Sequence, residues 1–207
     1  MNTEKVSKRK LQAAETKKKI YQAAEKLFKN CGFENVSVDS IVEMAGISKG
    51  GFYKHFESKD TLIVALINDY VNRVDLDYKS HLKSFHSKAS STEILISLVA
   101  KIAEIIIHTI GYDNIKAVYK ANITKTINTN ALMDYNRELY KIFNNIISRG
   151  MQQGEFIKGI HADIITKHCI IALRGLTYEW CIRYPDFDLK EQSLKHFEIL
   201  LAGIKVR

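Results

Sequence analysis

Proline is almost absent from this chain of 207 residues, which contains one, and glycine occurs only ten times. No run of alternating β-branched residues appears either. Proline and glycine punctuate turns, and alternation of apolar and polar residues predicts half-buried strands. These scarcities exclude a fold of many short strands and turns. The sequence therefore predicts a nearly all-α protein.

The residues that could bind metals or form covalent intermediates show no known motif spacing. The three cysteines have no short paired spacing, as expected of a chain in a reducing cytosol. The seven histidines form no His-Glu-x-x-His pattern, and neither a nucleophile elbow nor a Walker-type loop occurs. We therefore expect no enzyme activity, no metal and no cofactor. An enzyme built on an α-bundle remains the alternative, which turnover of a bound small molecule would reveal.

Long apolar runs are missing as well. The amino terminus is charged with no apolar stretch behind it, which argues against a signal peptide. The most apolar segment, residues 94–110, is short for a bilayer span and is interrupted by Lys101, Glu104 and His108. With 46% hydrophobic and 26% charged residues, the chain can bury a sizeable core. We expect a cytoplasmic protein without a membrane partner.

Positive charge is in excess. The chain has 31 lysines and arginines against 23 acidic residues, a net charge of +8. Seven of the basic residues precede the first apolar helix face: Lys5, Lys8, Arg9, Lys10, Lys17, Lys18 and Lys19. A positive end suits a polyanionic partner, nucleic acid first, although a solvated tail has the same composition. We expect a basic arm over residues 1–14 and a first helix from Thr16 to Cys31.

Two short helices separated by a tight turn are predicted between Ser37 and Phe56. Ser37 can cap the first helix, whose apolar positions recur at helical spacing as far as Ala45. Gly46 suits the left-handed residue that ends a helix, and Ser48 can cap the second helix. Helices joined in this way form a helix-turn-helix. A helical hairpin in an ordinary all-α domain, with solvated lysines, is the alternative.

The second of these helices has the character of a recognition helix. Phe52 and Phe56 share one face and can hold the core, while Gly50 and Gly51 leave the first turn bare. The remaining side chains are basic or carry hydroxyl groups, which donate hydrogen bonds to phosphate oxygens and base edges. A helix that enters the major groove needs this combination.

The run from Thr16 to about Leu66 resembles the amino-terminal domain of the TetR family of transcriptional regulators. The matching parts are KKKIYQAAEKLFKNCGFENVSVDSIVEMAG, followed directly by ISKGGFYKHFESKDTL. The order Gly-Ile-Ser-Lys-Gly, then tyrosine, phenylalanine and Ser-Lys-Asp, is specific to that family among helix-turn-helix proteins. Gly51 departs from the pattern, because the family usually has threonine, serine or alanine there. The resemblance covers roughly the first third of the chain.

The resemblance implies a three-helix DNA-binding domain over residues 15–60 and a larger helical effector-binding and dimerisation domain over residues 61–207. The double-stranded DNA contacts that we expect fall into two groups. Phosphates would be held by Ser37, Ser48, Tyr53, His55 and Lys59. The bases would lie nearest Lys49, Lys54 and the backbone at Gly50 and Gly51.

Six further helices are predicted after the helix-turn-helix, over residues 59–85, 92–110, 114–128, 132–153, 162–184 and 189–204. The last two look apolar on more than one face, which suggests a partner subunit. In the family, the last two long helices of each chain form the dimer interface. We therefore expect a homodimer.

The resemblance also implies a small hydrophobic effector between the middle helices. Glu104 and His108 lie four residues apart on an otherwise apolar helix and could orient a polar ligand group. The candidate effector residues are Glu104, His108, Tyr119, Phe143 and Trp180. The alternative is that the two polar residues pair with each other or reach the surface, and that the aromatic residues only pack in the hydrophobic core.

These observations predict a ligand-responsive repressor that binds an inverted-repeat operator as a homodimer. Two recognition helices would then lie about one DNA turn apart, ~34–36 Å, or a multiple of it. The alternative is a helical small-molecule-binding protein, or an activator, whose DNA binding is not specific for one operator.

Overall fold

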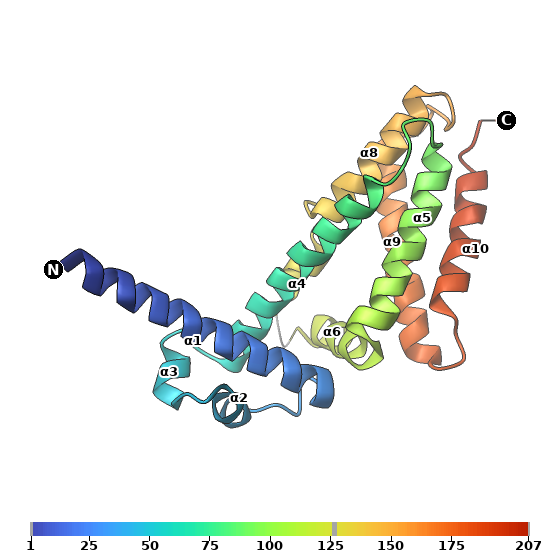
Figure 1. The fold of residues 1–207 in the computed structure, drawn as a ribbon. Helices are drawn as coiled ribbons and strands as arrows, with labels where there is room; N and C mark the ends of the chain where they lie inside the picture. The colour runs from blue at the N-terminus through green and yellow to red at the C-terminus, as the bar shows by residue number, and fades with distance from the viewer. Residues whose placement is uncertain (1, 126–127, 207) are drawn as a thin grey trace. The chain divides into compact units, whose positions relative to one another are not determined.

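The computed structural model describes residues 2–125 and 128–206, with side chains from Lys10 onward. The described residues form helices and turns without a named strand, so the all-α prediction is confirmed. In chain order the helices are α1 (Asn2–Cys31), α2 (Val38–Ala45), α3 (Lys49–Tyr53), α4 (Lys59–Leu82), α5 (Ser91–Glu104), the π-helix η1 (Ile105–Ile110), α6 (Tyr112–Thr124), α7 (Asn130–Met133), α8 (Glu138–Gln152), α9 (Ala162–Arg183) and α10 (Leu189–Ala202) (Figure 1).

The described chain divides into two compact units. The smaller unit comprises the residues up to Asp69 together with Ala117–Thr129, and the larger unit comprises Tyr70–Lys116 and the chain from Asn130 onward. The division within α4 lies after the boundary at residue 60 that the sequence suggested. Part of α6 also joins the amino-terminal unit, which no sequence pattern indicated.

The smaller unit contains α1, α2, α3 and the first part of α4, which share buried apolar side chains. Its α1 packs on α2, and α2 packs on α3 (Figure 1). The most deeply buried side chains come from four helices: Ile20, Ala24, Ile41, Phe52, Leu62 and Ile63. The 3.6-residue periodicity that predicted these faces therefore describes the packing.

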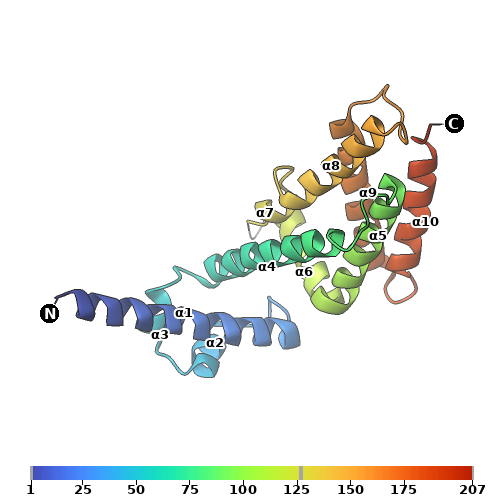
Figure 2. The same ribbon diagram turned by 45° about the horizontal axis from the view of Figure 1, so that its top comes forward.

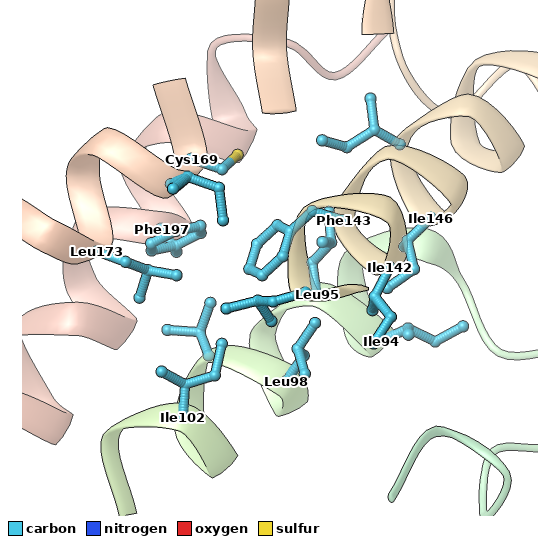
Figure 3. Packing of buried hydrophobic residues seen from close by; sticks show 14 of the residues in the cluster. Ile94, Leu95, Leu98, Ile102, Ile142, Phe143, Ile146, Cys169, Leu173 and Phe197 are labelled. Atoms are coloured by element: carbon cyan, nitrogen blue, oxygen red, sulfur yellow. The ribbon is translucent and has the colours of Figure 1, made fainter. Parts of the chain in front are cut away.

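The larger unit is a helical bundle in which α5 contacts α8 and α10, and α9 contacts α8 and α10 (Figure 2). Its core is shown in Figure 3, where Leu95 of α5, Phe143 of α8 and Phe197 of α10 lie close together. The Phe143 and Phe197 rings are 6.3 Å apart between centroids. Within the described residues, no single helix is long and apolar enough to cross a membrane. One bent pair of helices, Ser91–Ile110 with Tyr112–Thr124, is long and apolar enough when the two are taken together.

The predicted helices differ most from the structure at two places. The first helix begins at Asn2 and not at Thr16, so residues 2–14 continue α1. The predicted helix over residues 132–153 is two helices, α7 and α8, separated by a turn. In that turn an Asp134 carboxylate oxygen accepts a hydrogen bond from the backbone N–H of Asn136, at 2.7 Å. A short carboxylate that bonds its own backbone in this way competes with helix formation.

Glu155 holds the start of α5 from a distant part of the chain. One carboxylate oxygen accepts a hydrogen bond from the Ser91 N–H at 2.7 Å, and the other accepts one from the Thr92 N–H at 2.8 Å and another from the Thr92 hydroxyl. Burial alone would raise the pKa of Glu155, but these hydrogen bonds and the charge of Lys205 together outweigh burial and lower the pKa. The ionised side chain therefore caps a helix N-terminus.

We expect Glu155→Gln to lower the free energy of unfolding by about 1.5–3 kcal/mol at pH 7, because hydrogen bonds to a charged acceptor are lost. Since the pKa of Glu155 is lower in the folded than in the unfolded chain, this contribution is present at neutral pH. It decreases as the pH falls below about 4.5 and vanishes below the folded pKa. Denaturant titrations of both proteins from pH 7 to pH 3 should show the difference shrinking. The matched control is Glu198→Gln, at an exposed site of α10, and a pH-independent difference would contradict the assignment.

Gly150 of α8 is buried beneath the ring of Phe156, which is itself fully buried. A Cβ atom on Gly150 would lie 2.3 Å from Cδ2 of Phe156 and 3.0 Å from Cβ of Ser91. We expect Gly150→Ala to lower the free energy of unfolding by about 1–3 kcal/mol through overpacking, in spite of the better helix propensity of alanine. Chemical denaturation measures this loss.

The control is Gly51→Ala, whose Cβ would meet its nearest neighbour, Ser48 Oγ, at an ordinary 3.5 Å. Phe156→Leu in the Gly150→Ala background should recover part of the loss, since it removes the atoms that clash. Equal stability of the two alanine variants would show that the ring can move aside.

Candidate nucleic-acid interface

The helix-turn-helix forms as predicted, because local hydrogen bonds fix each of its boundaries. The Ser37 hydroxyl accepts a hydrogen bond from the Ser40 N–H at 3.1 Å, and the Ser40 side chain accepts one from the Ser37 N–H in return. Gly46 ends α2 in the left-handed region, at φ 63°. Its N–H donates to the Glu43 carbonyl, and the N–H of Ile47 donates to the Val42 carbonyl, both at 3.1 Å. This pair of bonds is a Schellman motif, which favours glycine.

The second helix of the motif, α3, is short. Ser48 caps it by accepting a hydrogen bond from the Gly51 N–H at 3.1 Å. The helix ends at Tyr53, earlier than the predicted end near Phe56, although the Phe56 N–H still donates to the Phe52 carbonyl at 3.0 Å. Phe52 is fully buried and fixes α3 on the core, so its other faces are turned outward.

Eight of the nine predicted DNA-contacting residues lie on or beside α3 or at the cap of α2, and all eight are at least partly accessible. Tyr53 is 53% exposed, and Lys54 is exposed next to it. Lys49 Nζ forms an ion pair with Asp39 of α2 at 2.6 Å. The hydrogen bond to the Asp39 carboxylate raises the pKa of Lys49. In this structure Lys49 therefore lies against α2.

Lys59 occupies a different environment. Its ammonium donates to the carbonyl oxygens of Phe33 and Val36, at 3.2 and 2.9 Å. These bonds tie the start of α4 to the loop between α1 and α2. A role for Lys59 on a phosphate stays a prediction, and the two carbonyls compete for the same donor.

Lys17 of α1 lies beside the helix-turn-helix. Its ammonium lies 5.4 Å from the centroid of the Tyr21 ring and 5.9 Å from that of Phe56, just after α3. The spacing of Lys17 and Tyr21, four residues apart on a helix, was the available sequence signal. The side chains of Lys5, Lys8 and Arg9 lie outside the described residues.

The five predicted effector residues do not form one cluster. Phe143 is fully buried in the core of the larger unit. Trp180 is buried against Tyr112 and Tyr184, with ring centroids 5.8 Å from each. Glu104 forms an ion pair with Lys190 at 2.6 Å, which lowers the pKa of Glu104, while His108 is exposed.

Tyr119 belongs to the smaller unit, unlike the other four. Among the described residues, no group of three histidine, cysteine or acidic side chains is placed to hold a metal ion.

Comparison with known proteins agrees with this geometry. A sequence model of the family described as bacterial regulatory proteins, tetR family, matches residues 20–66. The transcriptional regulator AcrR of Shigella flexneri is 26% identical over 94% of this chain and 91% of its own length. Among solved structures, a TetR-family regulator from Pectobacterium atrosepticum has a TM-score of 0.76 at 16% identity, covering 95% of this chain and 97% of that one.

The Bacillus subtilis regulator FadR, solved in complex with stearoyl-CoA, has a TM-score of 0.68 at 20% identity and covers 90% of this chain and 98% of its own. The structural likenesses extend the shared fold over both units. The helix-turn-helix at residues 37–56 lies within the matched family segment. Residues 20–66 therefore form a domain of the tetR family of bacterial regulatory proteins, and the chain shares the fold of TetR-family regulators over both units.

Proposed function

We propose that this protein is a sequence-specific repressor that binds an inverted-repeat operator as a homodimer and releases it when a small hydrophobic effector binds. The surface of α3 carries the proposal. Gly50 is exposed and Gly51 partly exposed, and neither has a positive φ. A Cβ at Gly50 would meet only Ser48 Oγ, at 3.9 Å. The fold therefore does not need glycine there, and a backbone that approaches DNA closely supplies a reason for it.

The roles on DNA follow from the exposed donors. Tyr53, Ser37 and Ser48 are exposed at or near helix termini, where hydroxyl groups can reach phosphate oxygens. Lys54 and the bare turn of α3 would lie nearest the bases. Lys49 would exchange its pairing with Asp39 for DNA.

The homodimer is supported by an exposed apolar stripe on α9. Ile164, Ile171, Tyr178 and Ile182 are 46%, 52%, 43% and 60% exposed, at intervals of seven, seven and four residues. A Cβ at Gly175, on the same face, would meet nothing within 4 Å. The opposite face is buried, as the sequence predicted for a helix apolar on more than one side. A partner helix would cover the stripe.

We place the effector in the larger unit, where α5, α8, α9 and α10 contribute to an apolar core. FadR, a similar structure, binds stearoyl-CoA, which supports a hydrophobic ligand class. Helix α4 contributes residues to both units and is the segment through which the effector would act on DNA binding.

Fluorescence anisotropy with the DNA upstream of the protein's own gene tests the proposal across a salt series. We expect tight binding to one inverted repeat, far above scrambled DNA, that weakens as salt rises. Equal, weak binding to every duplex in this region would contradict an operator at that site. The DNA binding would then be non-specific and electrostatic.

Gly50→Leu separates a role in DNA contact from one in folding. We expect operator affinity to fall at least tenfold while the unfolding midpoint stays the same or rises, because leucine is the better helix former. Lys26→Ala, which removes an exposed lysine from α1, serves as the control and should leave affinity nearly unchanged. Unchanged affinity of Gly50→Leu would remove α3 from the DNA contact.

A further inference from the structure

A hollow of about 330 Å³ lies within the smaller unit, lined by the loop after α1, the start of α4 and the second half of α6. Its apolar wall is formed by Phe33, Ile63, Ile67, Ala117, Val118 and Ala121. Ligand pockets usually measure about 300–1,000 Å³, so this hollow matches the smallest of them. It is separate from the core of the larger unit, where the effector was placed above.

The charged residues on its lining are mostly engaged already. The Lys59 ammonium donates to the Phe33 and Val36 carbonyls. Glu34 forms an ion pair with Lys120 at 2.7 Å. Asp60 also lines the hollow but is exposed, so water can solvate it.

This pattern of charges defines the ligand. A cationic ligand would meet the positive charge of Lys59, which its carbonyl partners do not neutralise, and an anionic ligand would meet the carboxylates of Glu34 and Asp60, so the lining favours neither sign of charge. An ammonium group has three donors, and two of those on Lys59 are used, so one can still donate to a ligand oxygen. We propose that this hollow binds a small, neutral, mainly apolar molecule whose hydroxyl or carbonyl oxygen accepts a hydrogen bond from Lys59.

The position of the site gives its occupant a direct route to the helix-turn-helix. Lys59 fixes the carbonyl of Val36, and Ser37, the cap of α2, is the next residue. A ligand oxygen bound to the same ammonium would share it with the Val36 carbonyl and would thereby alter the entry to α2. This consequence for DNA rests on the proposed function, whereas binding to the hollow does not.

Methyl NMR of the full chain with labelled isoleucine δ-methyl groups tests the binding, using 1-naphthol as the probe. Ile63 and Ile67 report on the hollow, and Ile94 and Ile142 report on the core of the larger unit. We expect saturable shifts of Ile63 and Ile67. The charged analogues 1-naphthoate and 1-naphthylmethylammonium should bind at least tenfold more weakly.

Ala121→Phe fills the hollow and should weaken 1-naphthol binding at least tenfold, while Ala202→Phe, at an exposed alanine of α10, should not. If Ala121→Phe does not fold, the chemical-shift changes of the wild-type protein with 1-naphthol and with the charged analogues still test binding to the hollow. The proposal is overturned if no shift saturates, if only Ile94 and Ile142 move, or if a charged analogue binds as tightly. Operator binding is measured separately, so failure here leaves the repressor proposal standing.

Discussion

Replacing Asp75 with alanine is expected to lower the free energy of unfolding by about 3–5 kcal/mol. Asp75 of α4 receives three hydrogen bonds from Arg137, at 2.7, 3.1 and 3.1 Å. The two side chains are only 7% and 16% exposed. Removal of the carboxylate leaves the guanidinium buried without a partner, and the cost of that unpaired charge dominates the effect.

The same pair tests whether the loss comes from the unpaired charge or from the ion pair itself. Asp75→Leu combined with Arg137→Met removes both charges, and we expect most of the stability to return. Urea titrations of the wild type, the two single variants and the double variant form a complete cycle. Additive losses in the double variant would show that packing, and not the orphaned charge, explains the single variants.

The sequence predicted those features of the smaller unit that depend on near neighbours. The caps at Ser37 and Ser48 and the left-handed Gly46 each involve hydrogen bonds across three to five residues. Periodicity was similarly sufficient for the buried faces of α1 and α4. These parts of the site follow from local chemistry, and the structure confirms them.

Contacts between distant residues could not be predicted in the same way. From the sequence, Lys59 is expected to be a free cation at the start of a helix, yet it donates hydrogen bonds to carbonyls 23 and 26 residues away. Glu104 and His108 suggested a polar pair, but Glu104 pairs with Lys190, 86 residues along the chain. A single sequence shows which groups can pair, whereas the packing of helices decides which of them do.

The break between α7 and α8 is an intermediate case. Apolar residues continue at helical spacing through this region, so periodicity favoured one helix over residues 132–153. The Asp134 side chain overrides that pattern by bonding to the Asn136 N–H. The turn is local, but its competition with the helix is a balance of about 1 kcal/mol, which the pattern alone does not settle.

Ile171→Glu is expected to abolish the proposed homodimer. Ile171 lies in the middle of the apolar stripe on α9, between Ile164 and Tyr178, and is 52% exposed in the single chain. In a dimer, the same position on both chains would face the partner. Burial of two carboxylates in the apolar interface would then oppose association. Light scattering after size exclusion should therefore report the mass of one chain, 23.7 kDa, and not of two.

Loss of the dimer should also weaken operator binding by about 10²–10⁴-fold, because each half-site would then be bound independently. The control is Ile123→Glu on α6, which is 66% exposed and lies outside the stripe. It should leave both the mass and the operator affinity unchanged, and circular dichroism should show that both variants are folded. A dimeric Ile171→Glu protein would place the interface elsewhere. A monomeric variant that binds the operator at full strength would instead separate DNA recognition from dimerisation, because one recognition helix would then be sufficient.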